Sequence, residues 1–161
     1  MEYIQLFQKL HQSQVRYLIC GGLAVNIYGI PRMTADIDIL LDFTDDNLER
    51  FEAAIKQLKY QSMIPLSIKT FVTKNERQKA IDEKNLIAYS YFNSQSNYMN
   101  LDVLMDVPLS FDEMWTDREE RVINEITVNI VSVEHLIALK QYANRKQDID
   151  DVLLLSKLSK K

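Results

Sequence analysis

Two aspartates at alternate positions are the residues of this 161-residue chain best suited to chemistry. Asp36 and Asp38 begin the run Asp-Ile-Asp-Ile-Leu-Leu, whose alternation predicts a β-strand with both carboxylates on one face. Their Cα atoms would lie roughly 6.5–7 Å apart, and like charges held that close raise each other's pKa unless a cation lies between them. Mg²⁺ takes one or two carboxylates and completes its shell with water and phosphate oxygens. The pair therefore predicts a magnesium site, although Asp-x-Asp alone also describes an ordinary exposed strand face.

A pair of glycines precedes these acids. Gly21 and Gly22 follow an apolar run at residues 15–19, which predicts a strand, and open an apolar segment at 23–28, which predicts a helix. Glycines at a helix start let backbone N–H groups approach an anion closely, and the helix dipole favours negative charge there. The spacing therefore predicts a phosphate cradle beside the metal site.

A third acid occurs about sixty residues later. Residues 86–92 and 99–105 both have strand-like composition, and the polar stretch 93–97 between them predicts a hairpin. In the second strand Leu101 and Val103 share one face, so Asp102 lies on the other.

The remaining elements predict the fold class. We expect helices at residues 1–12 and, capped by Thr44, from residue 45 onward, with a short helix or loop at 111–115. Residues 64–85 are ambiguous and end in a charged tract that predicts a solvated helix. The further elements expected are a hairpin at 121–131 turning at 124–125, a helix at 133–143 capped by Ser132, and a helix from about 147. The pattern predicts an α+β protein, with helices on a mixed β-sheet and a C-terminal helix pair. We expect one domain over 1–161, with a core at 15–131 and the closing helices at 133–158.

Composition narrows the class of protein. With 47% hydrophobic and 26% charged residues the chain resembles ordinary globular proteins, and its net charge of −4 argues against a surface built to attract nucleic acid. The single cysteine, Cys20, permits no intramolecular disulfide and is more simply a buried small residue than a nucleophile. No apolar run is long enough to cross a bilayer, so we expect no membrane association and a cytoplasmic protein.

Together these motifs resemble the nucleotidyltransferase superfamily, which shares the palm of DNA polymerase beta. The resemblance is closest to its small bacterial branch of abortive-infection toxins and minimal nucleotidyltransferases. It rests on Gly-Gly-Leu-Ala at 21–24, Gly29, Arg32, Thr34, Asp36-Ile37-Asp38, Leu101-Asp102-Val103, Leu136 to Lys140 and Ala143 to Asp148. The motifs fall from residue 17 to 151, which is nearly the whole chain.

The resemblance implies a reaction. Asp36, Asp38 and Asp102 would be the catalytic residues and would hold two Mg²⁺ ions, while Gly21 and Gly22 would bind the β- and γ-phosphates of a nucleoside triphosphate such as ATP. Many relatives have serine at the position of Gly22, so its hydroxyl contact is missing here. A nucleoside monophosphate would move to an acceptor hydroxyl on a small molecule, protein or RNA, and pyrophosphate would leave.

Several charged residues have two interpretations. Arg32 and Thr34 would contact phosphate, or Arg32 is a surface charge beside a turn; Lys140 and Arg145 would reach the triphosphate, or are solvated. We expect Asp148 and Asp151 to cap or charge the first turn of the last helix, and Asp42 and Asp106 to lie beyond the acidic cluster, near strand ends.

A second function class stays open from the sequence. The chain could be a nucleotide-binding regulatory protein or a toxin–antitoxin component that acts mainly through a protein partner. Three buried like charges favour the enzyme, because they are costly to keep without a metal. The core leaves little chain for an acceptor-binding domain. A second copy of the chain in a homodimer, or a partner subunit, would therefore supply one wall of the acceptor site.

Overall fold

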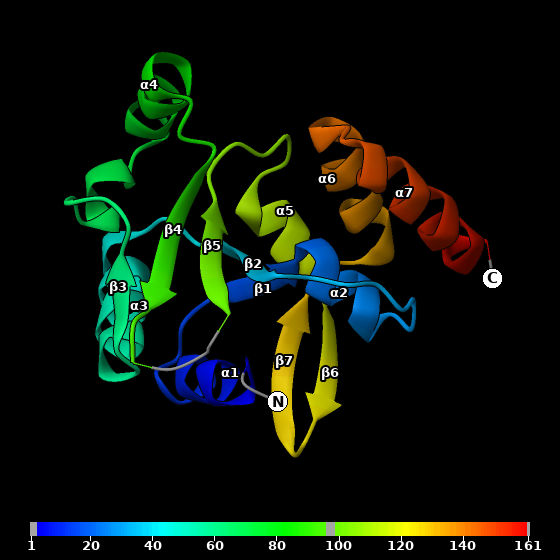
Figure 1. Ribbon diagram of the computed structural model, residues 1–161, viewed down its shortest axis with the longest axis horizontal. Helices are drawn as coiled ribbons and strands as arrows, with labels where there is room; N and C mark the ends of the chain where they lie inside the picture. The colour runs from blue at the N-terminus through cyan, green and yellow to red at the C-terminus, as the bar shows by residue number, and fades with distance from the viewer. Residues whose placement is uncertain (1–2, 96–98, 161) are drawn as a thin grey trace.

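The computed structural model describes residues 3–95 and 99–160, whose strands form one mixed seven-stranded sheet (Figure 1). The strand order is β3-β4-β5-β2-β1-β7-β6. The elements are α1 (Tyr3–Gln12), β1 (Tyr17–Cys20), α2 (Gly21–Ile27), β2 (Asp36–Leu41), α3 (Asp45–Gln57), β3 (Tyr60–Ser62), the 3₁₀ helix η1 (Ile68–Phe71), α4 (Lys74–Lys84), β4 (Ala88–Asn93), β5 (Asn100–Leu104), α5 (Phe111–Thr116), β6 (Glu119–Ile123), β7 (Ile126–Ile130), α6 (Val133–Ala143) and α7 (Lys146–Ser159).

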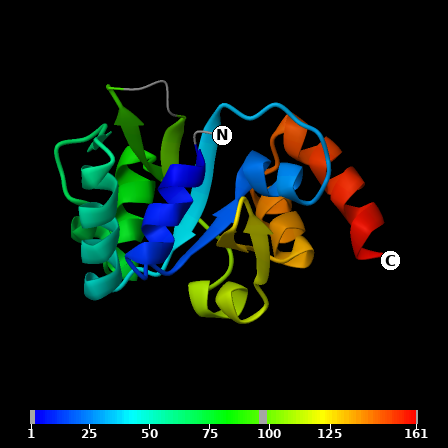
Figure 2. The ribbon, with the colours of Figure 1, turned by 90° about the horizontal axis from the view of Figure 1, so that it is seen from below.

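The pairing confirms the predicted mixed α+β class. β2 pairs in parallel with β5 and β1 with β7, whereas the other neighbouring strands are antiparallel. Helices α1 and α3 lie side by side (Figure 2), and α6 packs against α7 at the C-terminal end, as the predicted helix pair requires.

Most predicted elements are present, with shifted ends. Thr44 and Ser132 cap α3 and α6 by accepting the N–H groups of Asn47 (3.4 Å) and His135 (3.1 Å), as predicted. Helix α2 begins at Gly21 rather than at residue 23, because both glycines form its first turn. The 86–92 and 99–105 segments pair as β4 and β5, and part of their predicted turn, 96–98, lies outside the described residues. The 124–125 turn is confirmed by positive φ at Asn124 and Glu125.

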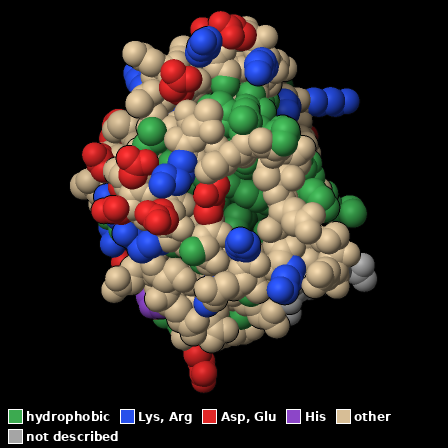
Figure 3. All heavy atoms as spheres, turned by 90° about the vertical axis from the view of Figure 1, so that its left-hand side faces the viewer, with side chains coloured by type: hydrophobic (Ala, Val, Ile, Leu, Met, Phe, Trp, Pro, Cys, Tyr) green, Lys and Arg blue, Asp and Glu red, His purple; other side chains and the backbone are tan. Residues whose placement is uncertain are grey.

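Strand β3 was not expected from the sequence. It has three residues and lies at the sheet edge, where the Tyr60 hydroxyl donates to the carbonyl of Met99 at 3.2 Å. The ambiguous segment 64–85 forms η1 and then the solvated helix α4, in which Ala80 is the residue that is buried. Between the loop after β3 and α4 lies an apolar hollow of about 690 Å³, and hydrophobic side chains gather on this side of the molecule (Figure 3).

A buried asparagine joins α3 to the central strands. Asn47 is 1% exposed; it accepts the N–H of Arg16 at 2.7 Å and donates to the carbonyls of Arg16 and Asp42, both at 2.9 Å. These bonds satisfy backbone groups at the start of β1 and the end of β2, which fixes where the two central strands begin and end.

We expect Asn47→Ala to lower the free energy of unfolding by about 2–4 kcal/mol, because it truncates a buried side chain and leaves the part-buried N–H of Arg16 and carbonyl of Asp42 without the hydrogen bonds that Asn47 makes. Urea unfolding followed by circular dichroism would measure the loss. The control Asn75→Ala, at an exposed position of α4, should change stability by less than about 0.5 kcal/mol. Equal effects of the two substitutions would contradict this role for Asn47.

Candidate active site

Strand register brings the three predicted acids onto one face of the sheet. In the parallel β2–β5 pair, Asp38 lies opposite Asp102, and Asp36 lies two residues earlier on the same face. The intervening residues Ile37 and Ile39 are 1% and 0% exposed, so they anchor β2 in the core from the other face. The alternation predicted from the sequence is therefore confirmed.

The glycine pair packs directly against this face. Cys20 lies opposite Asp38 in the antiparallel β1–β2 pair, so Gly21 follows beside the carboxylate. Gly21 has φ of +63°, and a Cβ there would overlap the Asp38 carboxylate. A Cβ at Gly22 would lie 2.8 Å from Thr34 Oγ1 and 3.3 Å from Arg32 Nε. Both positions therefore require glycine, because the side chains of neighbouring residues already fill the space that a Cβ would need.

Burial and mutual repulsion make the acids easier to protonate. The pKa of Asp38 is raised to about 6, first by burial and then by the charges of Asp102 and Asp36, against the lowering effect of Arg145 and Lys140. The pKa of Asp102 is also raised, by burial and by Asp36, while a hydrogen bond with Ser90 opposes the shift. A bound cation would offset the repulsion that raises these pKa values.

A cavity of about 550 Å³ brings the acids together with two cations from the C-terminal helices. Gly21, Asp38 and Asp102 line it from the sheet side, and Lys140 and Arg145 line it from the opposite side. Four other predicted site residues do not line this cavity: Asp36, Gly22, Arg32 and Thr34. The charge of Asp36 nevertheless raises the pKa of both Asp38 and Asp102.

The two cations are held by carboxylates of α7. Lys140 is only 4% exposed, and its Nζ lies 2.7 Å from Asp151 and 3.3 Å from Asp148. Asp148 also accepts the Nε–H of Arg145 at 2.9 Å and its backbone N–H at 3.0 Å. Lys140 is thus buried and paired rather than solvated.

Arg32 joins the same network from the loop before β2. Its guanidinium pairs with Asp151 and donates to Gln147 at 3.0 Å. Thr34 instead donates its hydroxyl to the Asp36 carbonyl at 3.0 Å. Arg32 is therefore not a free surface charge, and any contact with phosphate would have to compete with Asp151 or share it.

The sequence did not indicate that Asp148 and Asp151 hold these cations. Asp148 does cap α7 as expected, but both carboxylates are also nearly inaccessible, at 1% and 5% exposure, and neutralise Lys140 and Arg32. Their separation by three residues, which places them on one face of a helix, was the available signal. Asp42 pairs with Arg16, away from the cluster, whereas Asp106 lines the cavity and accepts the hydroxyl of Tyr142 at 2.7 Å. The expectation that Asp106 lies beyond the cluster was therefore wrong in part, because the chain after β5 turns along the cavity.

The donor chemistry of the acids suits magnesium. Their carboxylates share a face, and hard oxygen donors beside a space open to phosphate are the ligands that Mg²⁺ prefers. Within residues 3–95 and 99–160, no three carboxylate, histidine or cysteine side chains are already grouped closely enough to hold one ion. Asp36, Asp38 and Asp102 would therefore have to turn toward each other to share ions, and their repulsion opposes this without a cation.

Comparison with known proteins decides the family. Residues 6–157 match the family described as "Nucleotidyl transferase AbiEii toxin, Type IV TA system". The chain belongs to this AbiEii nucleotidyltransferase family. The resemblance stated from the glycine and aspartate motifs is thereby confirmed. No curated protein matches the chain by sequence.

Solved structures show that the AbiEii-family chain has a nucleotidyltransferase fold. A lincosamide antibiotic adenylyltransferase, LnuA, bound to lincomycin is 15% identical, with a TM-score of 0.63 over 96% of this chain and 94% of that one. ANT(2″)-Ia in complex with adenylyl-2″-tobramycin is 14% identical, with a TM-score of 0.59 over 96% and 85%. An antigenic nucleotidyltransferase-like protein from Paracoccidioides brasiliensis is 20% identical, with a TM-score of 0.58 over 95% and 72%. None of the described helices has the length and apolar character needed to cross a membrane.

We expect Asp38→Asn to stabilise the metal-free protein at about pH 7.5, by about 2 kcal/mol. The folded-state pKa of Asp38, about 6, lies above its ordinary value, so the protonated form favours folding and this contribution is lost as pH rises through about 6. The gain should therefore shrink toward zero near pH 4. Urea unfolding with EDTA at both pH values would test it, and a gain independent of pH would contradict the raised pKa.

We expect Gly21→Ala to weaken magnesium-dependent triphosphate binding by about tenfold or more, because the new methyl group displaces the Asp38 carboxylate. Gly29→Ala is the matched control, since Gly29 also has positive φ, +93°, but open space around it. Both variants should lose about 1 kcal/mol of stability from backbone strain, and Gly21→Ala should lose more because its methyl group also overlaps Asp38, while the control keeps its affinity. Isothermal titration calorimetry would compare them, and equal affinities would argue against the close packing of Gly21 on Asp38.

Proposed function

We propose that this protein transfers a nucleoside monophosphate from a nucleoside triphosphate to an acceptor hydroxyl and releases pyrophosphate. The observation that carries the proposal is the pairing of Asp38 with Asp102 across β2 and β5, in a cavity whose opposite wall carries Lys140 and Arg145. Carboxylates on one wall and cations on the other suit a magnesium-bound triphosphate, and membership of the AbiEii family supports the same reaction class.

The acids would hold two Mg²⁺ ions. Asp36 and Asp38 would bind the ion that carries the triphosphate, and Asp102 would complete the second site with them. When bound, the ions would neutralise charge that develops on the attacking and leaving oxygens of an in-line displacement.

The chain's own residues would position the triphosphate and accept the proton. Lys140 and Arg145 would face its charged oxygens, and the backbone N–H groups of Gly21 and Gly22 would approach the β- and γ-phosphates. The acceptor oxygen would bond to the α-phosphorus as the bond to the bridging oxygen breaks, and pyrophosphate would leave. Asp102 would take the hydroxyl proton, and burial, which raises its pKa, makes it a better base for this step.

Arg32 and Thr34 would act at the edge of the triphosphate site. Because Gly22 packs against both, they hold the start of α2 against the loop that leads into β2. Arg32 would reach phosphate only by leaving or sharing Asp151. In this assignment residues 15–131 form the catalytic core, and the helices at 133–158 supply the cations.

ATP is the first triphosphate to test, because two of the similar structures are named for adenylyl transfer or contain an adenylylated product. The acceptor hydroxyl would belong to a small molecule, a protein or an RNA, and a homodimer or partner subunit would complete its wall. We propose that the reaction takes place in the cytoplasm, where triphosphates are abundant. The family description also fits a toxin–antitoxin component that acts through a protein partner, and in that case nucleotide would bind without transfer.

We expect wild-type protein with Mg²⁺ to transfer label from an α-labelled triphosphate to a component of a cell lysate. Asp38→Ala should reduce the rate by about 100-fold or more, because it removes a metal ligand, while the protein stays folded. Asp46→Ala, which removes an exposed acid on α3, is the matched control and should keep full activity. Transfer by Asp38→Ala at the control's rate would overturn the proposal.

A binding assay separates the two functional classes. Isothermal titration with Mg²⁺ and each triphosphate should show metal-dependent binding in the wild type and its loss in Asp38→Ala. Binding without any labelled product would favour the regulatory alternative, whereas the absence of binding would remove both.

A further inference from the structure

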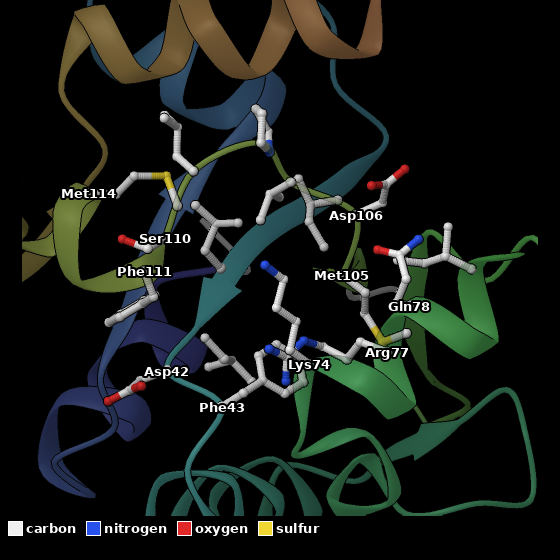
Figure 4. Close-up of a pocket in the computed structure, with 17 residues that line it drawn as sticks. Asp42, Phe43, Lys74, Arg77, Gln78, Met105, Asp106, Ser110, Phe111 and Met114 are labelled. Carbon is white, nitrogen blue, oxygen red and sulfur yellow. The ribbon is translucent and has the colours of Figure 1, made fainter.

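A second cavity, of about 360 Å³ (Figure 4), borders the cavity that holds the acids. The two share Leu104, Asp106 and Val107, so they meet along the chain that leaves β5. The second cavity lies at the ends of β2 and β5, past Asp38 and Asp102 in the strand direction, and α4 and α5 close its other sides.

Lys74, the first residue of α4, directs its ammonium group into this cavity (Figure 4). Among the described residues, no ion pair or hydrogen bond engages that ammonium group. The two acids of the cavity wall have other partners, since Asp42 pairs with Arg16 at 2.6 Å and Asp106 accepts the hydroxyl of Tyr142 at 2.7 Å. The Lys74 ammonium group therefore has no direct partner in the described part of the chain, while Asp106 keeps its negative charge, because the neutral Tyr142 hydroxyl does not offset it.

Arg77 adds a second, immobilised positive charge. Its Nη1 donates to the carbonyls of Phe71 at 2.9 Å and Val72 at 2.8 Å, and its guanidinium lies 4.4 Å from the centre of the Phe43 ring. These contacts hold the guanidinium at the cavity wall and leave its other N–H groups available to a ligand.

The rest of the wall combines apolar and polar side chains, and several of the apolar ones are buried. Leu40 and Leu41 are each 2% exposed and Met114 is 1% exposed. The side chains of Gln78 and Ser110 also line the cavity, and Lys74 is exposed, so its ammonium group is accessible to an anion from solvent. The size matches sites for metabolite-sized groups, which occupy about 300–1,000 Å³.

The position of the second cavity relative to the proposed reacting groups indicates what it binds. Lys140 and Arg145 face the acids in the first cavity, where the triphosphate would lie, whereas Lys74 and Arg77 line only the second. Asp102 and Leu104 share one face of β5, and Asp106 follows just after the strand; Leu104 and Asp106 line both cavities, so this part of the chain runs from the proposed base into the second cavity. A molecule held there could extend a hydroxyl past Val107 toward Asp102.

We propose that the second cavity is the acceptor subsite, and that the acceptor carries an anionic group, a phosphate or a carboxylate, bound by Lys74 and Arg77. This assignment rests on the proposed function and specifies its substrate class. An acceptor with an anionic group would gain affinity from the Lys74 ammonium group. A neutral nucleoside would not.

The test is an NMR titration of ¹⁵N-labelled protein saturated with Mg²⁺ and a non-transferable methylene analogue of ATP, so that the triphosphate site is filled. Inorganic phosphate and acetate are the probes, added in separate arms to distinguish the two anionic groups. We expect either or both to shift the signals of Lys74 and Arg77, and Lys74→Gln to weaken that binding about threefold or more. Lys79→Gln, on the same helix but lining the apolar hollow, should bind like wild type. Shifts confined to other residues, or equal affinities for the two variants, would overturn the subsite.

A parallel titration with the magnesium–nucleotide analogue separates this inference from the proposed function. Lys74→Gln should bind the analogue as tightly as wild type. Weaker binding would assign the second cavity to the nucleotide and overturn the acceptor subsite while leaving transfer intact. If wild type binds no analogue at all, the proposed function fails and the acceptor assignment fails with it, even where the probes still shift Lys74. Thermal unfolding of both lysine variants would confirm that they remain folded.

Discussion

The site depends on the parallel pairing of β2 with β5. This register places Asp38 opposite Asp102, and the antiparallel register of β1 with β2 brings Gly21 against the same carboxylate. A slip of one residue in either pair would turn the acids into the core and Ile37 and Ile39 outward. The full burial of those two isoleucines therefore fixes the acids as firmly as any contact the acids make themselves.

Holding like charges together has a cost that the rest of the molecule offsets. The raised pKa values of Asp38 and Asp102 show that the folded chain resists their ionisation. Lys140 and Arg145 reduce that cost from the opposite wall, and they are themselves neutralised by Asp148 and Asp151 behind them. Charge therefore alternates across the site, with acids on the sheet, the cations Lys140 and Arg145 in the middle, and acids on α7. A magnesium-bound triphosphate could enter this arrangement without leaving a buried charge unpaired.

The local elements could be predicted because their signals lie within a few residues. The alternation around Asp36 and Asp38, the caps at Thr44 and Ser132, and the turn at 124–125 each depend on neighbouring residues, and all are present. Strand β3 was missed because three residues carry too little pattern, and its pairing with β4 depends on residues about thirty positions away. The interpretation of Lys140 and Arg145 also depended on residues distant in the sequence. A solvated and a buried basic residue have the same neighbours in the sequence, so their burial could not be predicted.

The family, the strand–glycine–helix–strand unit and the face on which Asp36 and Asp38 lie could all be predicted from the order of the residues, because backbone geometry and side-chain alternation act over short separations. Three features became visible only in the folded molecule: Asp102 meets Asp38, Asp148 and Asp151 hold Lys140 and Arg32, and a cavity containing Lys74 adjoins the acids. These contacts join segments up to 119 positions apart, such as Arg32 and Asp151, and burial and charge pairing across such separations depend on how whole elements pack.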